Sequence, residues 1–131
     1  MRKLKGWLIM LSIFASLFSM TACSDGGAYS YELISPEQAK AIMDTEKEYI
    51  IIDARTAEEF AEGHIADAIL IPEYEIADRA EKELPDKEQL ILVYCRSGRR
   101  SKIASEELVK LGYTNVKEYG GIIDWPYKVV K

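Results

Sequence analysis

LILVYCRSGRRS (residues 90–101) joins an apolar run to a cysteine, a glycine and three arginines. The run from Leu90 to Tyr94 is apolar throughout, which is typical of a β-strand that is covered on both faces. Residues 101–111 then show helical spacing between Ser101, a good capping residue, and Gly112, a good helix terminator. We therefore predict a buried strand, a loop that begins at Cys95, and a helix that starts at Ser101.

The same alternation of short apolar runs and helical patterns extends along most of the chain. Further strands are expected at residues 50–52, 69–71 and 116–119, and further helices after Ser35, over residues 57–62 and within the acidic stretch 73–88. Strands that alternate with helices predict an α/β fold, with a mostly parallel central sheet of about five strands and helices on both faces. Ligands of such folds bind at the carboxyl ends of the strands, which is where Cys95 lies.

Cys95 is the candidate nucleophile, because it stands between the end of a strand and the start of a helix. A helix N-terminus carries partial positive charge, and Gly98 allows the N–H groups of the loop to turn inward around an anion. Arg96, Arg99 and Arg100 add positive charge to an otherwise acidic chain. These features favour a reactive thiolate and an anionic substrate. The simpler interpretations, a buried packing cysteine or a solvated helix start, leave the glycine and the arginines unexplained.

The segment from Cys95 to Ser101 resembles the active-site loop of the rhodanese (thiosulfate sulfurtransferase) family. Other motifs that resemble this family follow in the expected order, and they are Asp53-Ala54-Arg55, Glu59-Phe60, Gly63-His64-Ile65, residues 68–72, and Gly120-Gly121 with Trp125. Asp67 stands where glycine is frequent in the family, and Leu70 stands where asparagine is common. The resemblance implies one rhodanese-like domain over residues 31–131.

The resemblance also implies an activity and a set of site residues. Cys95 is the expected catalytic residue, which takes a sulfane sulfur as a persulfide from a donor such as thiosulfate and passes it to a thiol or cyanide. The expected substrate-binding residues are Arg96, Ser97, Gly98, Arg99, Arg100 and Ser101. Asp53 and Arg55 follow a buried strand, and this position favours a supporting role through a structural ion pair, for instance between Arg55 and Glu59. The alternative is that they line the mouth of the pocket. His64 resembles part of a structural turn, and no metal or organic cofactor is needed.

Two other functions are compatible with the same loop. Cysteine-based phosphatases or arsenate reductases are one alternative, and the related dual-specificity phosphatases carry an arginine six places after the cysteine. Here Arg100 lies five places after Cys95, and this shorter loop favours sulfur transfer. The second alternative is a non-catalytic rhodanese-like module that uses the basic loop to hold an anion or a partner.

Composition excludes several other classes of protein. The formal net charge of -5 and the pI of about 5.0 argue against nucleic-acid binding, which needs a positive surface. Two cysteines and one histidine exclude a four-cysteine or a histidine-rich metal site. No nucleic-acid partner is expected, and the resemblance to the rhodanese family implies a small anionic sulfur donor and a thiol or cyanide acceptor as partners.

The first 22 residues have the layout of a signal peptide. Arg2, Lys3 and Lys5 precede an apolar run from Trp7 to Phe18, and this run is shorter than the roughly 20 residues that a transmembrane helix needs. Small residues follow the run up to the end of the segment. Residues 1–22 are therefore predicted to direct export of the chain.

Cys23 is the predicted site of lipidation. Met20-Thr21-Ala22-Cys23 resembles the lipobox of bacterial lipoproteins, in which the cysteine becomes the lipid-modified first residue of the mature chain. The alternative is ordinary cleavage after Ala22, which leaves a free thiol. Residues 23–30 then form a short glycine-rich tether. The predicted location is the outer side of a membrane in the bacterial cell envelope, with the membrane as a partner through the anchor.

Overall fold

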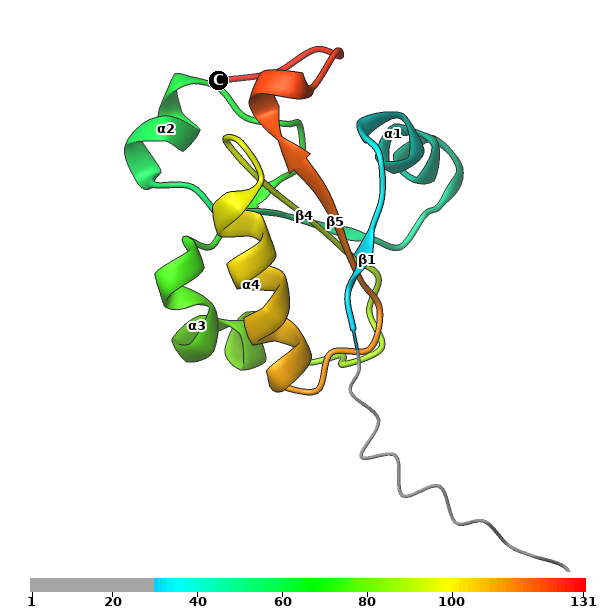
Figure 1. Cartoon of the computed structure of the whole chain (residues 1–131), viewed down its shortest axis with the longest axis vertical. Helices are drawn as coiled ribbons and strands as arrows, with labels where there is room; N and C mark the ends of the chain where they lie inside the picture. Colours follow the sequence, from blue (N-terminus) through cyan, green and yellow to red (C-terminus); the bar gives the residue numbers. More distant parts are fainter. Residues whose placement is uncertain (1–29) are drawn as a thin grey trace, which may run out of the picture.

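Five parallel strands form one sheet in the computed structural model, which describes residues 30–131. The order of the strands across the sheet is β1-β5-β4-β2-β3 (Figure 1). The strands are β1 (Glu32–Leu33), β2 (Ile50–Asp53), β3 (Ile69–Leu70), β4 (Ile91–Cys95) and β5 (Val116–Gly121). This arrangement confirms the predicted α/β fold with a five-stranded parallel sheet. The predicted signal peptide and Cys23 lie outside the described residues.

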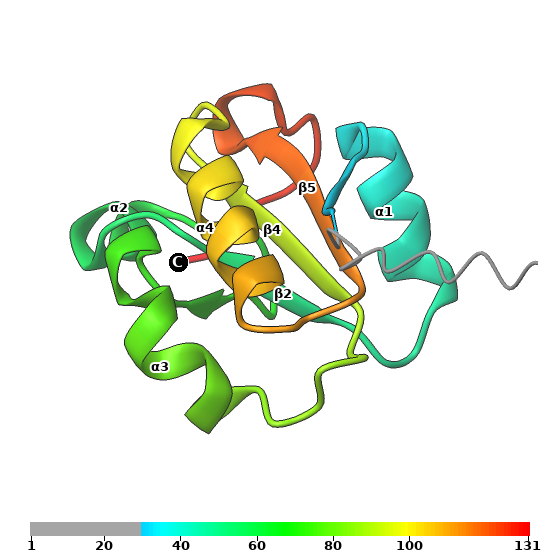
Figure 2. The same ribbon diagram turned by 60° about the horizontal axis from the view of Figure 1, so that its bottom comes forward.

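Helices cover both faces of the sheet (Figures 1 and 2). The α-helices are α1 (Pro36–Thr45), α2 (Ala57–Glu62), α3 (Ile76–Glu83) and α4 (Arg99–Lys110), and two short 3₁₀ turns span Glu73–Glu75 and Ile122–Asp124. Figure 2 shows α3 and α4 on one face and α1 on the other. Within residues 30–131, no helix combines the length and the apolar character needed to cross a bilayer.

The alternation of side chains along β4 joins the two halves of the core. Ile91 and Val93 point into a cluster with α3 and α4, whereas Leu92 and Tyr94 point into a cluster with α1. All five residues of β4 are buried, which is why the strand is apolar throughout. The strand lies between β2 and β5, so Cys95 at its end is held by the centre of the sheet.

Two of the predicted elements differ in the structure. The helix after the cysteine begins at Arg99 and not at Ser101, because Gly98 adopts φ +105° and turns the chain directly into the first helical turn. Arg99 and Arg100 therefore belong to α4 and not to the loop. The fifth strand, β1, was not located from the sequence, because it has two exposed residues and no apolar run.

Candidate active site

The sulfur of Cys95 lies at the carboxyl end of β4, beside the N-terminus of α4. Cys95 is only 1% exposed. The backbone N–H of Gly98 donates a hydrogen bond to Cys95 Sγ across 2.9 Å, and the hydroxyl oxygen of Ser101 lies 3.3 Å from the same sulfur. A backbone donor and the positive end of a 12-residue helix both favour negative charge on the sulfur.

Gly121 allows the last strand to close against the loop that follows Cys95. A Cβ atom at Gly121 would clash with the carbonyl oxygen of Arg96, so this position has no room for a side chain. Gly121 pairs with Cys95 in the sheet, after an irregularity in the β4–β5 register. The backbone N–H of Ile123 also donates to the Arg96 carbonyl, across 3.3 Å. The shape of the loop is therefore fixed by β5 and the turn that follows it.

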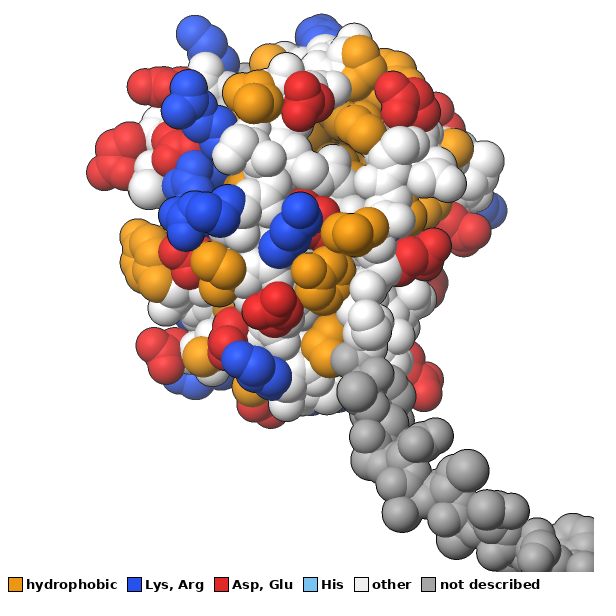
Figure 3. All heavy atoms as spheres, in the orientation of Figure 1, with side chains coloured by type: hydrophobic (Ala, Val, Ile, Leu, Met, Phe, Trp, Pro, Cys, Tyr) orange, Lys and Arg blue, Asp and Glu red, His pale blue; other side chains and the backbone are white. Residues whose placement is uncertain are grey.

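Four of the predicted substrate-binding residues line one open cleft. The cleft has a volume of about 590 Å³, and its lining residues are Glu59, Glu62, Arg96, Ser97, Arg99 and Arg100. Figure 3 shows Lys and Arg side chains gathered on this side of the molecule, with acidic side chains beside them. The other two predicted residues, Gly98 and Ser101, are buried next to the sulfur. The structure thus brings the whole predicted loop together around Cys95.

Arg100 is held in the cleft by Glu59 of α2. Its two terminal nitrogens donate to the two carboxylate oxygens of Glu59 across 2.8 and 2.9 Å. These hydrogen bonds raise the pKa of Arg100 and lower the pKa of Glu59. The sequence had suggested that Glu59 would pair with Arg55. That expectation is wrong, because α4 begins early enough to present Arg100 to α2.

Arg55 instead pairs with Asp53 at the end of β2. Its Nε and Nη2 atoms donate to the Asp53 carboxylate across 2.7–3.1 Å, and Nη2 also donates to the carbonyl of Gly63. The Tyr94 hydroxyl donates to Asp53 as well, and it accepts the N–H of Ile65.

This cluster is buried beneath the segment that follows α2. Burial opposes the charge on Arg55, but the hydrogen bonds to Asp53 outweigh it and raise the Arg55 pKa. Burial is also the main reason that the pKa of Tyr94 is raised. Asp53 and Arg55 do not line the cleft at Arg100. Their contacts tie β2 to the chain around Gly63, and their supporting role in the site stays a prediction.

Glu118 is a site residue that was not predicted from the sequence. It is 2% exposed, and its Oε1 atom accepts hydrogen bonds from the Ser101 hydroxyl (2.6 Å) and the Gly120 N–H (2.8 Å). A usable signal was present in the sequence. Glu118 lies two residues after Val116 in a predicted strand, and therefore on the same face as a core residue.

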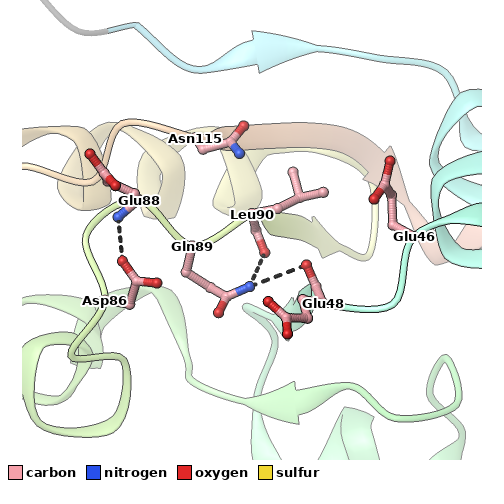
Figure 4. Close-up of a pocket in the computed structure, with 7 residues that line it drawn as sticks. All are labelled: Glu46, Glu48, Asp86, Glu88, Gln89, Leu90 and Asn115. Carbon is pink, nitrogen blue, oxygen red and sulfur yellow. Dashed lines mark hydrogen bonds between the residues drawn. The ribbon is translucent and has the colours of Figure 1, made fainter.

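A second depression lies near the amino ends of β2, β4 and β5, whereas Cys95 lies at the carboxyl end of β4 (Figure 4). Its volume is about 390 Å³, and its lining residues are Glu46, Glu48, Asp86, Glu88, Gln89, Leu90 and Asn115. The side-chain amide nitrogen of Gln89 donates to the carbonyls of Glu48 and Leu90. Four acidic residues make this depression unsuitable for an anionic substrate. Among residues 30–131, no group of three or more potential ligands is placed to hold a metal ion.

The rhodanese-like domain family matches residues 35–126 of the chain. This range includes the Cys95 loop, Asp53, Arg55 and the Gly120-Gly121 segment. Because the match covers well over half of the chain, the protein belongs to the rhodanese-like family. The resemblance inferred from the motifs is thereby confirmed for the family.

Named relatives refine this assignment. The chain is 40% identical over 80 residues to the thiosulfate sulfurtransferase PspE of Escherichia coli K12, which covers 61% of this chain and 77% of that protein. It is 35% identical over 99 residues to an adenylyltransferase and sulfurtransferase, UBA4, of Candida albicans, but spans only 23% of that protein. A solved structure described as a rhodanese with anions from E. coli superimposes with a TM-score of 0.60 at 38% identity, covering 63% of this chain and 98% of that one.

Proposed function

We propose that this protein is a sulfurtransferase that carries sulfane sulfur as a persulfide on Cys95. The observation that carries the proposal is the position of Cys95 Sγ, which accepts the Gly98 N–H at a helix N-terminus beside a cleft with three arginines. Relatives named as sulfurtransferases at 35–40% identity support this class of activity. A sulfur that is almost fully buried also favours a small donor over a bulky one.

Thiosulfate is the proposed donor. The Cys95 thiolate attacks the outer sulfur, a new S–S bond forms to Cys95, and the sulfur–sulfur bond of thiosulfate breaks. Sulfite leaves with the electron pair of that bond, and Arg96, Arg99 or Arg100 stabilises its charge. Cyanide or a thiolate then attacks the outer sulfur of the persulfide. Cys95 leaves as a thiolate, and no net oxidation of the protein occurs.

Intact-mass measurement after mixing the full-length protein with thiosulfate tests this proposal. One added sulfur that is removed by cyanide, and that is absent from Cys95→Ala, is the expected result. No adduct and no cyanide-dependent thiocyanate would sink the proposal. Turnover of an aryl phosphate would instead identify a phosphatase, and retention of an anion without chemistry would identify a binding module.

We also propose that the chain is exported and anchored to a membrane by lipid on Cys23. The support is the basic start, the apolar run and the lipobox-like Met20-Thr21-Ala22-Cys23. Labelling of bacterial cells with a palmitate analogue should mark the wild-type protein and should not mark Cys23→Ser. Cys95→Ala is the matched control and should be labelled like the wild type. Unlabelled wild-type protein recovered from the cytoplasm would contradict both parts of the proposal.

A further inference from the structure

A buried carboxylate lies two hydrogen bonds from the sulfur of Cys95. Glu118 belongs to β5, on the face that packs against α4, and is 2% exposed. Within residues 30–131, no lysine or arginine forms an ion pair with it. A carboxylate that is buried without a cation is costly, so an apolar residue would be the simpler choice for stability at this position.

Ser101 connects Glu118 to the sulfur. Its hydroxyl oxygen lies 2.6 Å from Glu118 Oε1 and 3.3 Å from Cys95 Sγ, and it also lies within hydrogen-bond reach of the Gly98 and Gly120 carbonyls. A hydroxyl carries one hydrogen and two acceptor lone pairs. When Ser101 donates to an ionised Glu118, it can accept the S–H of Cys95. When Glu118 is protonated and donates to Ser101, the hydroxyl can donate to a Cys95 thiolate.

We propose that Glu118 is a positioning residue that holds the proton of Cys95, acting through Ser101. The S–H bond of Cys95 breaks as an O–H bond forms at Ser101, and the original Ser101 proton forms a new O–H bond at Glu118 Oε1. The thiolate remains on Cys95, the net charge of the three groups is unchanged, and no electron or co-reactant is involved. The inference rests on the proposed function for its purpose, because sulfur transfer requires Cys95 to react and to leave as a thiolate.

Other titratable groups face this arrangement from the neighbouring elements. Arg100 of α4 lies close enough for the charge of Cys95 to contribute to the rise in its pKa. Burial chiefly raises the pKa values of Tyr31 and Tyr119, and the charge of Glu118 adds to both shifts. Arg100 is cationic and both tyrosines are neutral below pH 9. A change in thiolate content at acidic to neutral pH is therefore assigned to Cys95 and Glu118.

The pH dependence of Cys95 alkylation tests the proposal. The full-length reduced protein is treated with iodoacetamide, and the modified Cys95 peptide is measured by mass spectrometry. Wild type should keep a nearly level rate between about pH 5 and pH 8, because the proton moves within the protein. In Glu118→Gln, which keeps an acceptor oxygen but cannot take the proton, the rate should fall about 100-fold from pH 8 to pH 6, as for an ordinary thiol with a pKa of about 8.5.

Two further variants complete the test. Ser101→Ala breaks the connection and should give the same steep profile as Glu118→Gln. Ser105→Ala is the matched control, because Ser105 is a buried serine one turn along α4, and its hydroxyl bonds only the Ser101 carbonyl among residues 30–131. It should retain the level profile. If Glu118→Gln does not fold, Ser101→Ala still decides the question.

A level profile in either Glu118→Gln or Ser101→Ala overturns the proposal, as does a steep profile in the wild type. Alkylation needs no sulfur donor, so its outcome is separate from the proposed function. A protein that shows the level profile but gains no sulfur from thiosulfate would retain the proton arrangement and lose the proposed activity. If the protein transfers sulfur but its pH profile does not depend on Glu118, the proposed activity is supported and the proton arrangement is overturned.

Discussion

Two arginine–carboxylate pairs lie at α2, one formed just before the helix and one formed by a residue of the helix itself. They differ in their access to water. In the pair of Asp53 and Arg55, the side chains are 0% and 6% exposed, and the tyrosine hydroxyl of Tyr94 completes the carboxylate's contacts. In the pair of Glu59 and Arg100, they are 28% and 20% exposed and line the cleft next to the loop that follows Cys95. The two pairs consist of the same chemical groups, but one lies inside the protein and the other at its surface.

The difference separates a structural ion pair from one that is available to a substrate. Breaking the buried pair leaves a charge that is shielded from water and has no counter-ion, so Asp53 and Arg55 remain together. The pair of Glu59 and Arg100 exchanges partners at low cost, because water screens both charges. Arg100 binds Glu59 through two parallel hydrogen bonds, and a guanidinium can bind other oxyanions in the same way, so an anion that enters the cleft can replace Glu59.

The largest effect on the free energy of unfolding is expected when the buried pair of Asp53 and Arg55 is broken. Arg55→Met removes the cation and leaves Asp53 without its main partner, which should lower the free energy of unfolding by about 3–5 kcal/mol. Urea unfolding of the two proteins at neutral pH measures the difference. A loss below about 1 kcal/mol would mean that the buried pair behaves like the exposed one, and the comparison would fail.

Breaking the exposed pair should change substrate binding more than stability. Glu59→Gln removes the charge that competes for Arg100, so the KM for thiosulfate should fall about 1.4- to fivefold, which corresponds to the roughly 0.2–1 kcal/mol of an exposed pair. The free energy of unfolding should change by less than about 1 kcal/mol. Steady-state kinetics at constant ionic strength, with unfolding measured in parallel, provide both numbers.

Glu62→Gln is the matched control for that experiment. Glu62 also belongs to α2 and lines the same cleft, but it forms no ion pair among residues 30–131. Its removal changes the net charge equally without releasing an arginine. Equal drops in KM for Glu59→Gln and Glu62→Gln would mean that general electrostatics, and not the freed Arg100, explains the result.

The sequence was sufficient to predict the central strands of the sheet and the position of Cys95 at the end of one of them. β2 and β4 are apolar because they are covered on both faces, and a parallel sheet places the end of β4 at the ligand edge. Ser101 was expected to cap the helix by its residue type. In the structure Gly98 occupies the position before the helix, and its positive φ replaces the usual capping geometry. The helix α4 therefore begins at Arg99, two residues before Ser101.

Tertiary contacts account for what the sequence did not predict. Glu59 and Arg100 are 41 residues apart in the chain, and only the fold, which brings the start of α4 close to α2, selects this pair over the neighbouring Arg55. The structure also explains Asp67, which stands where glycine is frequent in the family. It adopts φ +66°, a left-handed conformation that explains why glycine is frequent there in the family.

The smallest expected effect concerns the acid end of the stability curve. Hydrogen bonds from Arg100 lower the pKa of Glu59 in the folded protein. Its contribution is therefore fully present above the unfolded pKa of about 4.3 and is lost as the pH falls through the folded value. Because the pair is partly exposed, this loss should stay below about 1 kcal/mol. Arg100→Gln should remove the contribution of Glu59 to the pH dependence of the free energy of unfolding, and the contributions of other groups should remain.

Urea unfolding of wild type and Arg100→Gln between about pH 3 and pH 7 measures the effect as a difference between two curves. The curves should be separated at neutral pH and converge towards acid, because protonated Glu59 no longer gains from the arginine. Curves that stay parallel would mean that Glu59 keeps an ordinary pKa and that solvent screens the pair completely. In that case Arg100 is already free to bind an anion, and the predicted drop in KM for Glu59→Gln should also be missing.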